Sequence, residues 1–144
     1  MRSLDPYSYH LLQAWDCFRL GAVHQGFWAF GDNGGGSAWR EGQVGGTCYT
    51  PQFLDERGCE TSKHMEAIRE GRFDYEYLTL LRDAVAKAPP GPARDRGQAL
   101  LAEAPRRVLG DAGAEALAWS AAKDRGLADR TRTDVLAALE ALTP

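Results

Sequence analysis

A short apolar segment, residues 26–30, places the strongest constraint on the fold of this chain. The run Gly-Phe-Trp-Ala-Phe shows no alternation of polar and apolar residues, which is typical of a strand covered on both faces, as in a parallel sheet. The backbone N–H and C=O groups of such a strand need neighbouring strands, and the sequence offers no second strand of comparable quality. Either residues 47–54 pair with it, or other strands belong to a longer protein. We expect the latter, because the strands of βα repeats occur in sets; the alternative is a small α+β domain complete in itself.

A helix is predicted on each side of this strand. Asp5 and Pro6 suit the start of a helix over residues 5–20, because Asp accepts unpaired N–H groups and Pro is tolerated at the first helical position. Gly21 supplies the end of that helix. Thr61 and Ser62 suit the start of a second helix, over residues 62–87.

The second helix contains an apparent interruption. Gly71 breaks its apolar pattern, and Asp74 has the features of a second N-cap, with Phe73 and Leu78 at the spacing of a hydrophobic staple. The sequence therefore predicts a new helical start within residues 62–87.

The Pro-Pro-Gly-Pro sequence at residues 89–92 divides the chain, because prolines remove backbone donors and disfavour helix in the preceding residue. Three short Ala-rich helices are predicted after it, around residues 94–104, 114–122 and 133–142. The predicted fold is thus of the α/β class but mostly helical by content. Residues 1–88 would carry the last strand and helices of a (β/α)8, TIM-type barrel, and residues 89–144 would form an all-helical C-terminal extension.

Composition narrows the classes of partner. The chain has 144 residues, a formal net charge of −3 and an isoelectric point near 5.6, so it lacks the basic field that binds phosphate backbones, and we expect no nucleic-acid partner. No apolar run approaches the roughly twenty residues of a membrane helix, and the N-terminus lacks the apolar stretch of a signal peptide. We expect no membrane partner, and the cellular location stays open.

The cysteines and histidines do not form a recognisable metal motif. Cys17, Cys48 and Cys59 lack the paired spacing of zinc sites, and the three histidines are scattered singly. We therefore expect no metal and no cofactor. Cys48 and Cys59 flank a loop, and the sequence does not decide whether they form a disulfide.

The candidate binding residues are aromatic and polar side chains at and beyond the C-terminal end of the predicted strand, which faces the active site in a βα barrel. Aromatic rings stack on the C–H faces of sugars, while Asp and Asn hydrogen-bond to hydroxyl groups, so the combination favours carbohydrate. The alternative is that the aromatics are core residues and the polar pair only forms a turn. The predicted substrate-binding residues are Trp28, Phe30, Asp32, Asn33, Trp39 and Tyr49.

Other chemistries are not supported. The Gly-rich run at residues 31–37 is not followed by the Lys and Ser or Thr of a phosphate-binding loop, and it lacks the alternating acids of a calcium loop. The carboxylates of the second helix have the density of a solvated face with intrahelical ion pairs rather than of a glycosidase acid pair. We therefore assign no catalytic residue within this chain.

The pattern resembles the end of the glycoside hydrolase family 123-like catalytic domain. In that family a strand ending in an aromatic and polar cluster is followed by a Gly-rich loop and by a helix of the form S-x-x-x-E-A-x-R-E-G-x-x-D-Y-E-Y-L. The resemblance covers roughly residues 5–88. The matching helix residues are Ser62, Glu66, Ala67, Arg69, Glu70, Gly71, Asp74, Tyr75, Glu76, Tyr77 and Leu78.

The resemblance implies a retaining glycosidase in which a neighbouring Asp and Glu assist attack by the 2-acetamido group of the substrate. That pair lies on an earlier strand of the family's barrel, and nothing in this chain matches it. The expectation is therefore a C-terminal portion that contributes sugar contacts, inactive alone, with an N-acetylated amino sugar as the ligand. Two alternatives are a noncatalytic carbohydrate-binding or scaffolding module and a small helical interaction protein.

Overall fold

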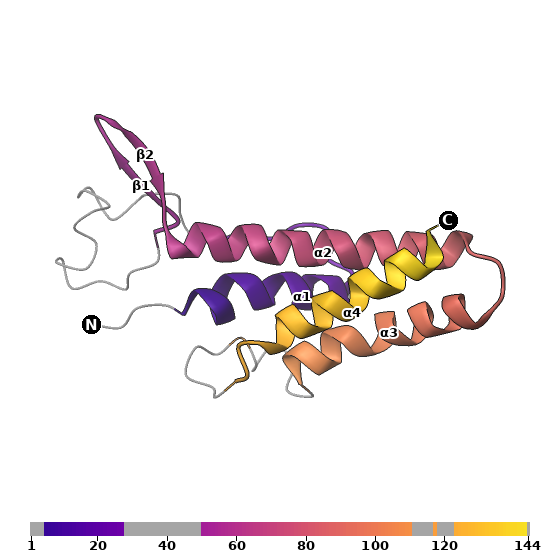
Figure 1. Ribbon diagram of the computed structural model, residues 1–144. Coiled ribbons are helices and arrows are strands. Elements are labelled where there is room, and N and C mark those ends of the chain that lie inside the picture. Colours follow the sequence, from indigo (N-terminus) through magenta and orange to yellow (C-terminus); the bar gives the residue numbers. More distant parts are fainter. Residues whose placement is uncertain (1–4, 28–49, 111–116, 118–122, 144) are drawn as a thin grey trace.

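The computed structural model describes residues 5–27, 50–110, 117 and 123–143, which are mostly helical. Figure 1 shows α1, α2 and α4 running in one direction and α3 in the opposite direction, with a hairpin projecting from the N-terminal end of α2. The elements are a π-helical turn η1 (Tyr7–Leu11), α1 (Leu12–Leu20), β1 (Gln52–Asp55), β2 (Gly58–Thr61), α2 (Lys63–Lys87), α3 (Pro92–Leu109) and α4 (Leu127–Leu142).

The prediction of a barrel portion is wrong. The sheet that the structure describes is two-stranded and antiparallel, with Gln52 opposite Thr61 in the register of β1 and β2. Of the predicted strand at residues 26–30, Gly26 and Phe27 have no regular structure, and residues 28–30 lie outside the described residues. Phe27 packs its ring against His10 of η1, so its apolar side chain is covered by a helix instead of a sheet. The expectation of mainly helical content is confirmed.

The first predicted helix is confirmed as η1 followed by α1. The carboxylate of Asp5 accepts a hydrogen bond from the Ser8 hydroxyl at 2.6 Å, and the backbone N–H of Tyr9 donates to the Asp5 carbonyl at 2.9 Å. Gly21 ends α1 in the left-handed conformation, at φ 68°, where a side chain would be strained.

The second predicted helix is confirmed as α2, but the interruption predicted within it is absent. The helix is continuous for 25 residues, with the Ser62 side chain as its N-cap, and Asp74 lies in its middle rather than at a second start. Gly71 marks a close approach to the first helix: a Cβ atom placed there would lie 3.0 Å from the carbonyl oxygen of Leu11 and 3.2 Å from the Cβ of Ala14. Gly71 thus lies where η1 and α1 approach α2 closely, so that even a methyl group would be crowded, and it does not mark the end of a helix.

One core joins all four α-helices. Leu12 and Trp15 of α1 pack with buried residues of α2, α3 and α4, so helices on both sides of the turn at residues 88–91 share it. The remaining core residues are Leu11, Leu78, Leu81, Val85, Ala104, Val108, Leu109, Ala128 and Val135.

The helices after the proline-rich turn are longer than predicted. The third helix continues through Pro105 to Leu109, and Pro105 is buried, so packing offsets the backbone hydrogen bond that proline removes. The last helix begins at Leu127, earlier than the predicted 133. The helix predicted around residues 114–122 lies outside the described residues, apart from Leu117.

Candidate functional site

Residues 21–27, which we call the return segment, run back from the end of α1 and lead directly into residues 28–49. Three contacts fix the segment to the helices. The Tyr75 hydroxyl donates to the Ala22 carbonyl at 3.1 Å, and the Gln25 amide donates to the Gln13 side-chain oxygen at 2.7 Å. The Phe27 ring meets His10 edge to face, with centroids 5.2 Å apart. Phe27, the last described residue before residues 28–49, thus packs against η1.

Thr50 and Pro51, the first described residues after residues 28–49, are held by the N-cap of α2. The Ser62 hydroxyl donates to the Thr50 carbonyl at 2.7 Å and accepts from the backbone N–H of His64 at 3.1 Å. The Ser62 backbone N–H donates to the Pro51 carbonyl at 3.0 Å, and both Thr50 and Pro51 are buried. A single serine therefore begins the helix and anchors the chain that enters it.

A pair of buried histidines connects Phe27 to the first turn of α2. The rings of His10 and His64 lie 5.5 Å apart, nearly perpendicular, and are 1% and 3% exposed. Neither ring nitrogen of His10 has a hydrogen-bond partner among the described residues. Burial, with a smaller effect from His64, lowers the pKa of His10 from 6.5 to about 4. His10 is therefore neutral at pH 7 and acts as a packed ring between the two ends.

A pocket of about 370 Å³ lies between the return segment and the adjacent faces of α1 and α2. Its lining includes the aromatic rings of Phe27 and Tyr75 and the polar side chains of Gln25, Arg72 and Glu76. Arg72 and Glu76 form an ion pair, with Nε 2.9 Å from Oε1, on the rim of this return-segment pocket. The volume suits a small ligand, and flat apolar rings beside hydrogen-bonding groups form a surface of the kind that sugars bind.

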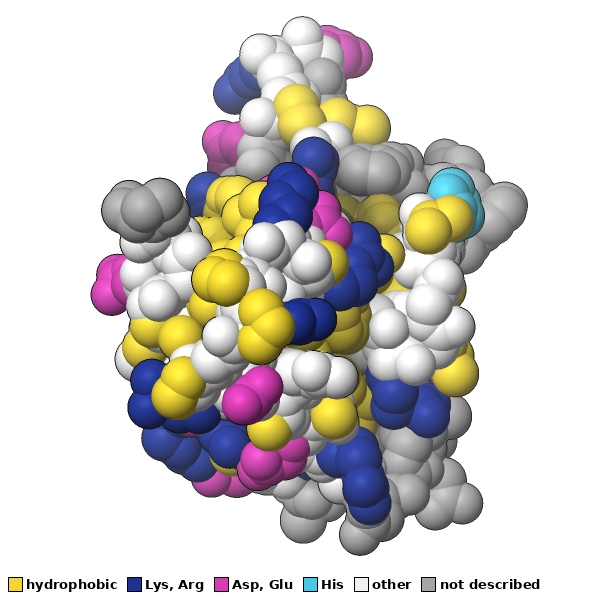
Figure 2. Space-filling view, turned by 90° about the vertical axis from the view of Figure 1, so that its right-hand side faces the viewer, with side chains coloured by type: hydrophobic (Ala, Val, Ile, Leu, Met, Phe, Trp, Pro, Cys, Tyr) yellow, Lys and Arg dark blue, Asp and Glu magenta, His cyan; other side chains and the backbone are white. Residues whose placement is uncertain are grey.

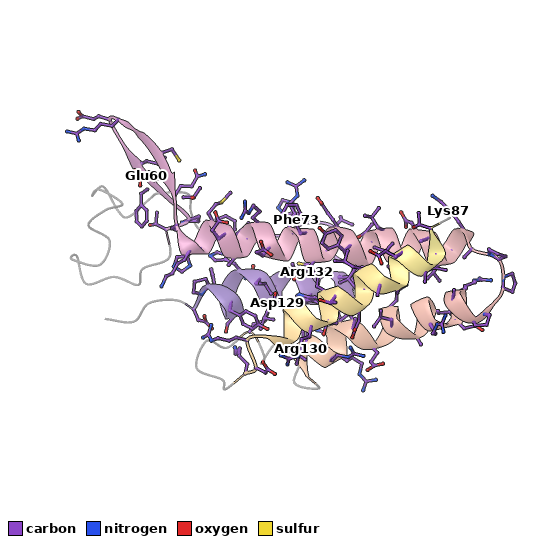
Figure 3. The ribbon with its side chains drawn as sticks, viewed as in Figure 1. Glu60, Phe73, Lys87, Asp129, Arg130 and Arg132 are labelled. Atoms are coloured by element: carbon purple, nitrogen blue, oxygen red, sulfur yellow. The ribbon has the colours of Figure 1, made fainter. Side chains whose placement is uncertain are left out.

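A buried polar network lies beneath the site and connects three helices. The Trp15 indole donates to the Asp74 carboxylate at 2.8 Å, and Arg132 of α4 donates to the same carboxylate through Nε and to Glu70 at 2.8 Å. Figure 3 shows Arg132 on the side of α4 that faces α2, with Asp129 one turn before it.

The position of Asp74 explains its electrostatics. Its side chain is fully buried, and this desolvation raises the pKa of its carboxyl group, while the hydrogen bonds from Arg132 and Trp15 act in the opposite direction. The Asp74 carboxylate accepts from two donors on two other helices, Trp15 and Arg132. This is the arrangement of a structural cross-link between helices rather than of an exposed general acid.

The helix residues that carry the family resemblance thus have positioning roles. Ser62 holds the far anchor, Gly71 permits close approach of α1, Asp74 holds Trp15 and Arg132, and Tyr75 holds the return segment. Sequence reasoning missed the histidine pair, because His10 and His64 are far apart in the chain. The available signal was that His10 precedes Ala14 by one helical turn, which places it on the inner face of the first helix.

All six predicted substrate-binding residues, Trp28, Phe30, Asp32, Asn33, Trp39 and Tyr49, lie outside the described residues, as does Cys48. Of the helix carboxylates, Glu66 and Glu76 form intrahelical ion pairs with Arg69 and Arg72, in agreement with the expected solvated face.

Two further findings concern metal ions and membranes. Within residues 5–27, 50–110, 117 and 123–143, no group of three or more His, Cys, Asp or Glu side chains is arranged to hold a metal ion. In the same part of the chain, the helices lack the combined length and hydrophobicity of a membrane span. Comparison of the chain with models of known protein families, with curated proteins and with solved structures finds no match.

Proposed function

We propose that this chain is a noncatalytic carbohydrate-contacting part of a glycoside hydrolase-like protein, in which the helices present residues 28–49 to a sugar. The observation that carries the proposal is the double anchoring of that segment. Phe27 and Thr50, the described residues at its two ends, are both fixed around His10, His64 and Ser62. Fixing the residues on either side of a binding segment lowers the entropic cost of ordering that segment on a ligand.

The chemistry of the segment and of its surroundings agrees with a sugar ligand. Residues 28–49 contain the aromatic side chains Trp28 and Trp39 and the polar pair Asp32 and Asn33. The return-segment pocket, which leads into this segment through Phe27, adds ring faces and charged hydrogen-bonding groups. Aromatic faces for C–H groups and carboxylate or amide groups for hydroxyls are what a pyranose requires.

Hydrolysis is assigned to residues beyond this chain. A glycosidase needs two groups on opposite sides of one bond, and the carboxylates of α2 that the structure describes are each held in an ion pair with an arginine. Glu70 contacts Arg132, Asp74 is buried beneath the site, and Glu76 pairs with Arg72. The proposal therefore predicts binding of an amino sugar without its cleavage.

The test is a titration of the protein with N-acetylgalactosamine and N-acetylglucosamine glycosides, in which calorimetry and tryptophan fluorescence measure the affinity. Trp28→Ala and Trp39→Ala should each weaken binding by tenfold or more, about 1.4 kcal/mol. Phe73→Ala, which removes an exposed aromatic ring from α2 instead, is the matched control and should bind as wild type. Equal affinity of all four proteins, or no binding at millimolar sugar, would refute the proposal.

A second set of variants tests the pocket separately from residues 28–49. Arg72→Gln and Glu76→Gln each remove one charge from the rim, and because Arg72 is 77% exposed, neither should alter the melting temperature by more than a few degrees. Weaker sugar binding by both variants would place the ligand at the return-segment pocket. Wild-type binding by both would leave residues 28–49 as the contact and exclude the pocket.

A further inference from the structure

The longest helix, α2, carries apolar side chains on two faces. Its inner face supplies Leu78 and Leu81 to the core. On its outer face Phe73 is 41% exposed and Leu80 is 54% exposed, and the Tyr77 ring stacks beside Phe73 with centroids 6.4 Å apart. With the half-buried Tyr77 between them along the helix, Phe73 and Leu80 give the outer face of α2 an apolar stripe, and exposed apolar patches are candidate interaction surfaces.

These outer residues belong to a row with a regular charge pattern. Glu66, Phe73, Leu80 and Lys87 follow one another at intervals of seven residues, so they lie along one side of α2. At a rise of about 1.5 Å per residue the row is roughly 32 Å long. It begins with an acid and ends with a base, and Figure 3 shows Phe73 and Lys87 spaced along the helix.

We propose that this row, the α2 seam, binds the α2 seam of a second copy of the chain in antiparallel orientation. In that arrangement Glu66 lies opposite Lys87 of the second copy, and Phe73 lies opposite Leu80 of the second copy. A twofold axis near the middle of the helix repeats each contact, so two ion pairs flank two apolar contacts.

Flanking charges select the antiparallel arrangement. Arg69 and Asp83, which are 58% and 53% exposed, come to lie near each other across the twofold axis. A parallel pair of seams would instead place Glu66 against Glu66 and Lys87 against Lys87, and like charges in contact oppose association. The charges at the two ends of the seam therefore favour the antiparallel direction.

The contact surface extends beyond the seam. At the C-terminal end of α2 an open groove of about 1020 Å³ is lined by Leu80 and Lys87, by Leu136 of α4 and by the turn at residues 89–92. Figure 2 looks onto this end of the bundle and shows hydrophobic side chains among Lys, Arg, Asp and Glu. In the antiparallel pair the N-terminal end of the second α2 reaches this groove, which adds apolar area to the contact. This added area matters because stable dimers bury about 1,200 Å² or more of accessible surface in total.

The first test is charge reversal, with sedimentation velocity of the whole chain over a concentration series. Glu66→Lys and Lys87→Glu should each weaken the dimer by tenfold or more, and an equimolar mixture of the two variants should restore wild-type affinity, because both ion pairs re-form in the mixed dimer. Glu103→Lys and Arg130→Glu make the same changes of charge on exposed positions of α3 and α4, outside the seam, and should leave the dimer intact. Failure of the mixture to recover would overturn the proposal.

The second test concerns the apolar part of the seam. Leu80→Glu should abolish the dimer, whereas Leu20→Glu, which introduces the same charge at a position 64% exposed on α1, should not. Both replaced leucines are exposed, so both variants should keep the wild-type circular dichroism spectrum. A wild-type protein that is monomeric at all concentrations, or equal effects of the two variants, would contradict self-association through α2.

Discussion

Replacement of the buried carboxylate Asp74 should unfold the protein at markedly lower denaturant concentration. Asp74→Leu removes the acceptor of both Trp15 Nε1 and Arg132 Nε. The indole N–H would then be buried without a partner, at about 1–3 kcal/mol. Arg132 would keep its contact with Glu70 and is 19% exposed, so its loss is smaller than that of an isolated buried charge. We expect the free energy of unfolding to fall by about 3 kcal/mol in total.

The partner variant Arg132→Met should be about as harmful, because it leaves the carboxylate of Asp74 buried with one donor. The double variant removes both charges of the buried pair at once, leaves the indole N–H of Trp15 unpaired, and releases the partly exposed Glu70. Its expected loss is therefore at most about 3 kcal/mol, instead of the sum of about 6, which is a coupling energy of at least about 3 kcal/mol.

Urea unfolding, monitored by circular dichroism and tryptophan fluorescence, gives the free energy of unfolding of the wild type, the two single variants and the double variant. Arg130→Met is the control, since Arg130 lies on the same helix but pairs with Asp124 at the surface, where both side chains are more than half exposed. That pair should contribute little to stability, because water and salt screen exposed charges. Additive losses in the double variant, or a loss in Arg130→Met equal to that in Arg132→Met, would show that the network does not couple the helices.

Three further predictions concern the site and its supports. Gly71→Ala should destabilise the protein by about 1–2 kcal/mol in urea unfolding, because crowding against the Leu11 backbone outweighs the roughly 1 kcal/mol gained in helix propensity; a more stable variant would disprove the close approach. The folded-state pKa of His10 lies below its unfolded value, so stability should fall by up to about 3 kcal/mol as the pH drops from 6.5 to 4. His10→Phe should flatten that dependence, and an unchanged slope would contradict the burial of the ring. Tyr75→Phe, which loses one hydrogen bond to the return segment, should cost about 1 kcal/mol and raise amide exchange in that segment, while unchanged exchange would argue against its anchoring role.

Local signals in the sequence predicted the helices well. Pro6 and Gly21 bracket the first helix, and Ser62 begins α2, because capping and turn preferences act within a few residues. The barrel prediction failed because an apolar run such as residues 26–30 reports burial without saying what covers it. In the described part of that run, Phe27 is covered by a helix.

The candidate site was less accessible to sequence reasoning, since its geometry depends on long-range contacts. Asp74 has the local features of a cap, yet its two donors, Trp15 and Arg132, are 59 and 58 residues away in sequence. The same holds for the meeting of His10 and His64. The glycine at position 71 was misread for the same reason. Glycine disfavours a helix interior, which suggested that the helix ends there, but Gly71 lies inside α2 at a close contact with the neighbouring helix.

The described residues on either side of residues 28–49 are both fixed to the helices: Phe27 packs on His10, and the Thr50 carbonyl accepts from Ser62. For a flexible insert, halving or doubling its length changes the closure entropy by only about 0.6 kcal/mol. Flexible inserts of different length and composition placed between Phe27 and Thr50 should therefore leave the helices folded. The helices would then serve as a support on which a binding segment is varied without loss of the fold.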